Sequence, residues 1–229
     1  MSKDPLTFVQ IKAMVGRDDP VIIDAGSNDG THTNRFIKTF PQASVYSFEP
    51  DPRAIAKWKQ NVIDPRATLI ESALGAVSGE ATFHVSSGQR PGWEDDPSYV
   101  LGWDQSGSLR APKNHLEASP WVEFEKQIRV KVITLDEWAA DYGIDRIDFI
   151  WADVQGSESD LIDGGRGVMK RTRYFYTEYS NKELYDGQIT LDAITELLTD
   201  DFEMVAYWRD DVLFKNTLLA FSHLFSNTR

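Results

Sequence analysis

The most constraining feature of the sequence is the stretch Val21–Thr31, in which a strand-like run leads directly into a glycine-flanked turn. Three β-branched residues precede Asp24, and Gly26 and Gly30 bracket three small polar residues. This pattern predicts a buried strand, a tight turn and the start of a helix. The two glycines allow a sharp bend and the close approach of a ligand, which would face the free N–H groups of the helix.

Glu49 provides the second half of this signal. It follows Gly30 by nineteen positions, at the end of another strand-like run, Ser44–Phe48. A carboxylate at that distance, one strand over, can accept hydrogen bonds from both hydroxyls of a bound ribose. The alternative is a surface residue that merely precedes Pro50.

The rest of the chain alternates between strand-like and helical patterns. We expect helices at residues 6–15, 31–40, 52–62, 157–163 and 190–198. We expect strands at residues 67–71, 79–85, 127–134, 147–151, 173–179, 202–208 and 212–221. The order predicts a parallel sheet with right-handed crossovers, closed by an antiparallel hairpin at the C-terminal end.

Residues 86–126 interrupt the alternation. The segment contains several prolines and three tryptophans, Trp93, Trp103 and Trp121. Loops of this length inside compact domains are usually functional or disordered, and disordered linkers are poor in aromatic residues. We therefore interpret it as an inserted lid or acceptor-binding segment, with a mobile spacer as the alternative. Apart from this insertion, the sequence shows no domain boundary, so we expect a single domain over residues 1–229, with an N-terminal helix within residues 1–19.

Composition excludes several classes of protein. With 41% hydrophobic and 12% aromatic residues the chain can build a core, and its net charge of −12 argues against a nucleic-acid partner. It contains no cysteine, so disulfides and thiol chemistry are excluded. We expect no membrane insertion, because no stretch approaches about 18 apolar residues. Without the apolar core of a signal peptide near Met1, a cytoplasmic protein is expected.

The expected topology resembles the α/β, Rossmann-like fold of class I S-adenosylmethionine-dependent methyltransferases, a mainly parallel seven-stranded sheet that ends in an antiparallel hairpin. The dinucleotide-binding dehydrogenases fit less well, because they carry G-x-G-x-x-G whereas here the spacing is Gly26-x-x-x-Gly30.

Six short motifs, in order, carry a closer resemblance. They are Ile23-Asp24-Ala25-Gly26-Ser27-Asn28-Asp29-Gly30, Phe48-Glu49-Pro50, Ala73-Leu74-Gly75 with Gly79, Thr134-Leu135-Asp136, Ile147-Asp148-Phe149-Ile150 and Asp153-Val154-Gln155-Gly156-Ser157-Glu158. Together they resemble the FkbM-type family of methyltransferases over about residues 20–205. One departure is Gln155, where many relatives carry glutamate.

The resemblance implies methyl transfer from S-adenosyl-L-methionine to an oxygen of a small-molecule or glycan acceptor, such as a carbohydrate, a glycolipid or a related natural product. Two alternatives remain open: a catalytically inactive methyltransferase-fold binding module, and a dinucleotide-dependent oxidoreductase. The sequence leaves the oligomeric state undetermined.

The cofactor would then be bound by the segments that follow the first three strands. Asp24 and the amides of the glycine-flanked turn would hold its amino-acid end, Glu49 its ribose, and the end of the third strand its adenine. A capping or turn-stabilising role is the alternative for Asp24 and for the third strand end. The expected cofactor-binding residues are Asp24, Gly26, Ser27, Asn28, Gly30, Thr31, Glu49, Pro50, Asp51, Glu71, Ser72, Ala73 and Asp153.

Catalysis would depend on carboxylates after the later strands. Asp153 is the best candidate for a general base or acceptor ligand, against a purely helix-capping role. Glu178 could bind an acceptor hydroxyl, and His115 could take the proton if the insertion folds over the site. The expected acceptor-binding residues are Gln155, Glu158, Trp103 and Ser108, and no metal site is expected.

Overall fold

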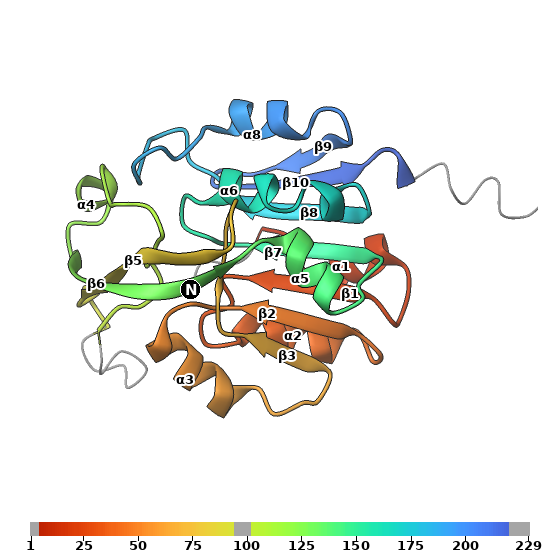
Figure 1. The fold of residues 1–229 in the computed structure, drawn as a ribbon, viewed down its shortest axis with the longest axis horizontal. Coiled ribbons are helices and arrows are strands. Elements are labelled where there is room, and N and C mark those ends of the chain that lie inside the picture. Colours follow the sequence, from red (N-terminus) through yellow and green to blue (C-terminus); the bar gives the residue numbers. More distant parts are fainter. Residues whose placement is uncertain (1–4, 94–101, 220–229) are drawn as a thin grey trace, which may run out of the picture.

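The computed structural model describes residues 5–93 and 102–219 of the chain. The main sheet is formed by β1 (Val21–Ala25), β2 (Ser44–Phe48), β3 (Ala67–Ile70), β7 (Ile147–Ala152), β8 (Thr172–Glu178), β9 (Phe202–Tyr207) and β10 (Asp211–Asn216). Its strand order is β3-β2-β1-β7-β8-β10-β9 (Figure 1). The strands from β3 to β8 pair in parallel, and β10 is antiparallel to both of its neighbours. The expected mainly parallel seven-stranded sheet with a closing hairpin is therefore confirmed.

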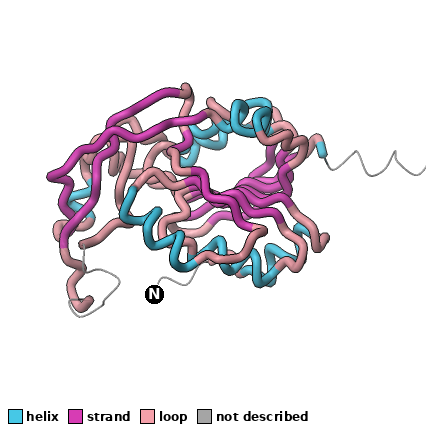
Figure 2. The backbone as a smooth tube through the Cα atoms, turned by 60° about the horizontal axis from the view of Figure 1, so that its bottom comes forward, coloured by secondary structure: helices cyan, strands magenta, loops and turns pink. Residues whose placement is uncertain are grey.

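Helices cover both faces of this sheet, as Figure 2 shows. They are α1 (Phe8–Val15), α2 (Thr31–Thr39), α3 (Pro52–Asn61), α5 (Leu135–Asp141), α6 (Glu158–Asp163), α7 (Arg166–Met169) and α8 (Leu191–Leu198), while the short α4 (His115–Ala118) lies in the inserted segment, away from this sheet. Within the described parts of the chain, none of these helices has the length and apolar character that a membrane span requires.

Alternation along the strands explains the two helical layers. Ile22 packs in one core with residues of α1, α2 and α3, whereas its neighbour Ile23 packs in a second core with residues of α5 to α8. Successive strand residues point to opposite faces, so a strand buried on both sides must be apolar throughout. All six residues of β7, at the centre of the sheet, are buried accordingly.

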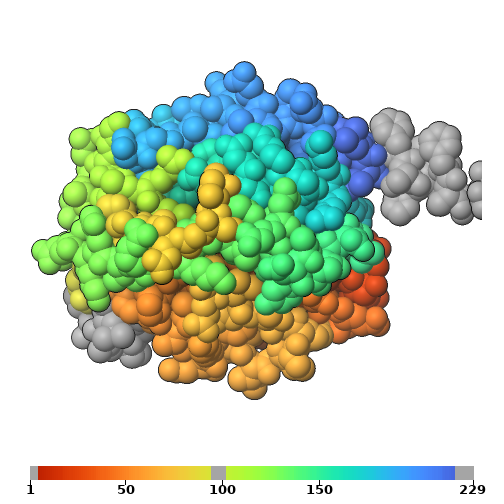
Figure 3. Space-filling model, in the orientation of Figure 1, coloured from red at the N-terminus to blue at the C-terminus, as the bar shows by residue number. Residues whose placement is uncertain are grey.

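The segment that interrupts the alternation of strands and helices extends from a second, three-stranded sheet. β5 (Gly79–Gly88) and β6 (Val122–Ile133) pair antiparallel, and β4 (Ala73–Leu74) pairs with the end of β6. The expected insertion at 86–126 thus begins and ends inside this ribbon, because Gly88 pairs with Val122. The part of it at 94–101, like residues 1–4 and 220–229, lies outside the described residues. Figure 3 shows the insertion, coloured yellow to green, at one end of the molecule.

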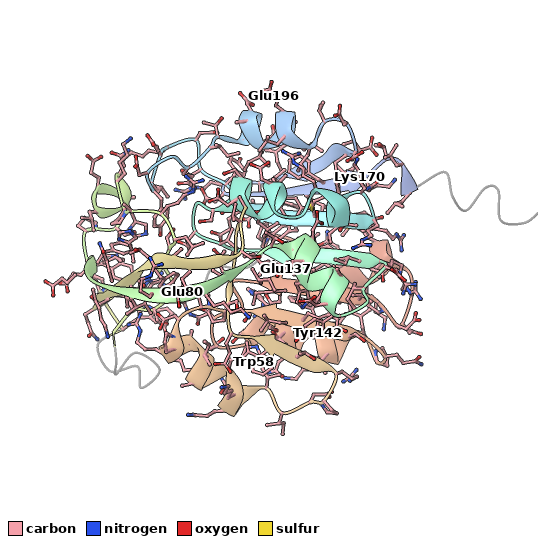
Figure 4. The ribbon with its side chains drawn as sticks, in the orientation of Figure 1. Trp58, Glu80, Glu137, Tyr142, Lys170 and Glu196 are labelled. Atoms are coloured by element: carbon pink, nitrogen blue, oxygen red, sulfur yellow. The ribbon has the colours of Figure 1, made fainter. Side chains whose placement is uncertain are left out.

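Two helix starts show how local sequence fixes the elements beside the site. At α3 the side chain of Asp51 accepts a hydrogen bond from the Arg53 N–H, and Pro52 opens the helix. At α5 the Thr134 hydroxyl accepts from the Glu137 N–H at 3.1 Å, which is one half of a capping box. In place of a direct second hydrogen bond, the Ser78 hydroxyl bridges the two residues. It donates to the Glu137 carboxylate and accepts from the Thr134 N–H (Glu137 is labelled in Figure 4).

Candidate active site

A cavity of about 450 Å³ lies at the carboxyl edge of the main sheet, beneath the insertion. This is the edge at which open parallel sheets bind their ligands. The predicted site residues that line it are Gly26, Ser27, Asn28, Thr31, Glu49, Pro50, Ala73, Trp103, Ser108, Asp153, Gln155 and Glu178. We call the part formed by the loops after β1 and β2 the β1–β2 end, and the part formed after β7 and β8 the β7–β8 end.

The turn after β1 brings two strand ends together. Gly26 has φ +79°, and a Cβ atom there would lie 1.9 Å from the carbonyl oxygen of Asp153. Only glycine permits that approach, which joins the β1–β2 end to the loop after β7. Gly30, also at positive φ, packs against Trp58 and Val62 of the α3 segment. Gly30 therefore shapes the turn without lining the cavity.

Glu49 is held at the β1–β2 end by backbone donors. Its Oε2 accepts from the Asn28 N–H at 2.9 Å and its Oε1 from the Asp51 N–H at 2.8 Å. Burial raises the pKa of Glu49 to about 8, although these two N–H groups act in the opposite direction. The carboxylate is thus fixed in orientation at the cavity wall, with its remaining lone pairs available to hydroxyl donors.

Beneath this wall lie two side chains with unsatisfied oxygens. Asp24 is fully buried and does not line the cavity: its Oδ2 accepts from the Thr33 hydroxyl at 2.6 Å, while Oδ1 has no partner among the described residues. Burial raises the pKa of Asp24, and the positive charge of His32 lowers it. Ser27, 3% exposed, does line the cavity, and its hydroxyl has no partner within the described parts of the chain. A buried hydroxyl facing a cavity indicates that something polar binds there.

Besides Asp24 and Gly30, three more residues expected near the cofactor do not line the cavity. Glu71 is exposed and forms an ion pair with Lys59 at 2.6 Å, because the chain turns outward after β3. Ser72 is buried beneath the wall, and of this strand end only Ala73 reaches the cavity. Asp51 caps α3 and pairs with Arg53 at 2.6 Å, so its carboxylate is already engaged.

The β7–β8 end is acidic. Asp153 begins the loop after β7, and its Oδ1 accepts from the Gln155 amide at 2.5 Å. Burial raises the pKa of Asp153, while the Gln155 hydrogen bond and the charge of His32 lower it. The negative charge of Asp153, together with burial, holds the pKa of Glu178 well above its usual range. Paired carboxylates with raised proton affinity are typical of a site that accepts a proton near neutral pH.

Glu158 and His115 lie behind this end and do not line the cavity. Glu158 is buried at the start of α6, where it accepts from the Gly156 N–H, and burial raises its pKa to about 7. His115 packs against the rings of Phe124 and Tyr185, each at 5.3 Å, and burial lowers its pKa. Neither side chain reaches the cavity in this arrangement, because α6 and α4 direct them into the protein.

The insertion is fastened over the cavity from several sides. Asp104 accepts from the Asn28 side chain through its backbone oxygen at 3.0 Å and pairs with Lys57 at 2.7 Å. Ser108 donates to the Gln155 carbonyl oxygen at 2.7 Å. Trp103 is buried and packs edge-on against Trp121 at 4.9 Å, so it anchors the insertion as well as lining the cavity. The insertion therefore forms the roof of the cavity.

Two residues of the site carry no recognisable signal in the sequence. Asp104 lines the cavity and Tyr185 hydrogen-bonds to Gln155, yet each lies in an irregular segment without periodicity. His32, in the helix that follows the glycine-flanked turn, also lines the cavity. Within the described ranges, no group of three or more histidine and carboxylate side chains is arranged to hold a metal ion.

Sequence comparison places these features in a known family. A model described as the methyltransferase FkbM domain matches residues 24–209. A protein named 2-O-methyltransferase NoeI, from Sinorhizobium fredii, is 44% identical over 216 residues, which cover 92% of this chain and 85% of that protein. A protein named Methyltransferase 1, from Beauveria bassiana, is 22% identical over 153 residues, or 64% of this chain and 59% of that one.

The fold comparison agrees. The crystal structure of a methyltransferase FkbM from Methylobacillus flagellatus superposes with a TM-score of 0.51 at 14% identity, covering 87% of this chain. This chain spans 44% of the length of that protein. The fold is shared, and the family match extends from β1 to the closing hairpin.

Proposed function

The chain belongs to the FkbM methyltransferase family, and from that premise we propose that it methylates a hydroxyl of a carbohydrate, a glycolipid or a related natural product, with S-adenosyl-L-methionine as the methyl donor. That it is an O-methyltransferase follows from its 44% identity with an enzyme named for that reaction. The acceptor class and the roles of individual residues are the proposed part.

The β1–β2 end fits the cofactor. The buried Ser27 hydroxyl without a described partner and the oriented Glu49 carboxylate both border the cavity. Glu49 would accept the ribose hydroxyls, and the turn at Gly26–Asn28 would hold the amino-acid end. When bound, the cofactor supplies an electrophilic methyl group on a sulfonium.

The β7–β8 end fits the acceptor. Asp153 would take the proton of the acceptor hydroxyl as its oxygen gains the methyl group, and Glu178 would orient the same or a neighbouring hydroxyl. The insertion would cover both ligands and exclude water, with Trp103 offering an apolar wall to a sugar face. A general base of this kind contributes roughly 10²–10⁴-fold to the rate, and positioning supplies most of the remainder.

The observation that carries the proposal is the position of Asp153. It stands where the β1–β2 end meets the acidic β7–β8 end, in contact with the cofactor-side turn through Gly26. A carboxylate with a raised pKa at that junction suits removal of a proton from a hydroxyl.

The test has two steps. Calorimetry with S-adenosyl-L-methionine should show one site per chain, and mass spectrometry of a panel of mono- and oligosaccharides should show the gain of one methyl group. Because the 44% identical relative is named a 2-O-methyltransferase, each acceptor is paired with its 2-deoxy analogue. Loss of product with the 2-deoxy analogue supports methylation at that position. Cofactor binding without turnover on any hydroxylated acceptor would favour the inactive binding module and overturn the proposal.

A further inference from the structure

A continuous chain of hydrogen bonds leads from the roof of the cavity to Asp153. The Tyr185 hydroxyl lies 2.8 Å from Gln155 Oε1, and Gln155 Nε2 lies 2.5 Å from Asp153 Oδ1. The same hydroxyl lies 2.9 Å from the backbone oxygen of Ser106, in the insertion. Tyr185 is 1% exposed, so these contacts are shielded from bulk water.

The backbone of Gln155 is held in an unusual conformation to make this chain. Its φ is +49°, in the left-handed region that a non-glycine residue adopts only at a cost. The Ser108 hydroxyl donates to its carbonyl oxygen, and the next residue, Gly156, has φ +91° where a Cβ atom would press on the Tyr185 ring. Such a conformation persists when several contacts fix it together, and here they aim the side-chain amide at Asp153.

The direction of the donors follows from elementary chemistry. Burial raises the pKa of Tyr185, so its hydroxyl keeps its single proton, which the Ser106 backbone oxygen and Gln155 Oε1 share as acceptors. With Oε1 toward Tyr185, the Nε2 group faces Asp153. If the amide were flipped, two oxygens would meet at 2.5 Å, which is stable only when the Asp153 carboxyl carries the proton.

We propose that Gln155 and Tyr185 are positioning residues that keep Asp153 unprotonated and occupy its Oδ1, so that the proton of the acceptor is received at Oδ2. This inference rests on the proposed function. Among the described residues none donates to Oδ2, while Asp153 borders the cavity.

The charges around Asp153 explain why the neighbouring side chain at position 155 has to be an uncharged hydrogen-bond donor. The ionisable side chains that face Asp153 come from every neighbouring element: His32, Asp24, Glu158, Glu178, Tyr185 and Asp211. All except His32 and the protonated Tyr185 are acidic, so they favour protonation of Asp153. A glutamate at position 155 would add a carboxylate that has to share a proton with Asp153.

The experiment compares three single variants on the active enzyme with a sugar acceptor. Tyr185→Phe removes only the hydroxyl, Gln155→Asn tolerates positive φ but is too short to reach Asp153, and Gln155→Glu replaces the donor by a carboxylate. We expect kcat to fall by about 3–10-fold for Tyr185→Phe and about 10–30-fold for Gln155→Asn, with cofactor affinity unchanged. The acid limb of the kcat profile should move to higher pH in all three, and furthest in Gln155→Glu.

A double-mutant cycle separates this role from a merely structural one. If Tyr185 acts only through Gln155, Tyr185→Phe should cost almost nothing once Gln155→Asn is present. Tyr142→Phe and Gln42→Glu, at exposed positions near the opposite edge of the sheet, are the matched controls and should leave the pH profile in place. Figure 4 labels Tyr142.

A second readout does not need turnover. Carbon-13 NMR titration of the Asp153 carboxyl in the ligand-free protein should give a higher pKa in Gln155→Asn than in the wild type. An unchanged Asp153 titration and acid limb in both Gln155 variants, or additive losses in the double variant, would overturn the inference. A wild-type enzyme that methylates no hydroxyl, yet shows the expected NMR shift, would overturn the proposed function and leave the positioning of Asp153 supported.

Discussion

The β1–β2 end and the β7–β8 end of the cavity are assembled from different kinds of chain segment. At the first, Glu49 meets donors 2 and 21 residues away, all on consecutive strand–turn–helix units. At the second, Gln155 meets Tyr185 30 residues away and Ser108 47 residues away, from loops without regular structure. A site built on consecutive strand ends depends on the sheet alone, whereas one built from loops depends on how those loops pack.

The electrostatics differ in the same way. Burial raises the pKa of Glu49, but two backbone N–H donors offset part of that effect. At the other end the offset is smaller for Glu178, because the negative charge of Asp153 and burial both raise the pKa of Glu178. We therefore expect changes at the β1–β2 end to affect binding, and changes at the β7–β8 end to affect turnover.

The largest expected effect tests that division. Asp153→Asn keeps an acceptor for the Gln155 amide but loses the base, and kcat should fall by about 10²–10⁴-fold. The Kd for S-adenosyl-L-methionine, measured by calorimetry, should change by less than about threefold, because the ribose contacts are elsewhere. Comparable losses in Kd and kcat would show that the two ends are not separable.

Glu49→Gln should produce the opposite pattern. Loss of the charged acceptor should raise the cofactor Kd by about 10–100-fold and leave kcat at saturation nearly unchanged. Since the pKa of Glu49 is about 8, the wild-type Kd should fall as the pH rises from about 6 and level off above about 8, when the carboxylate is fully formed. Calorimetry across that range should find no such slope in the variant.

A smaller effect concerns stability. The pKa of Glu158 is about 7, against an ordinary value of 4.5, so the folded chain binds this proton more tightly than the unfolded chain. The free energy of unfolding should therefore fall by about 1–3 kcal/mol as the pH rises from about 5 to about 8. Calorimetric unfolding of the ligand-free protein should show a lower Tm at the higher pH, and Glu158→Gln should reduce this dependence. A Tm that rises over the range would contradict the raised pKa.

The smallest expected effect tests whether Glu71 lies outside the β1–β2 end. Glu71→Gln removes an exposed ion pair with Lys59, and surface pairs of this kind are worth little. Cofactor Kd and kcat should both stay within about twofold of the wild type. A larger change in Kd would mean that the chain after β3 turns inward when the cofactor binds.

The sequence by itself determined the sheet and the β1–β2 end. Strand periodicity, the two glycines and the spacing to Glu49 are local properties, and parallel strands bring their carboxyl ends to one edge regardless of the loops. The same logic placed Asp153 and Glu178 at that edge, because Asp153 follows β7 and Glu178 ends β8.

Only the tertiary structure decided which side chains reach the cavity and which point away. Glu71 and His115 belong to the right segments, but a turn and a short helix direct them outward and into the core. Tyr185 and the partners of Gln155 are brought together by contacts between loops, which depend on packing and backbone conformation rather than on any repeat in the sequence. Such contacts become visible only when the whole chain is folded, because residues far apart in sequence share no local pattern.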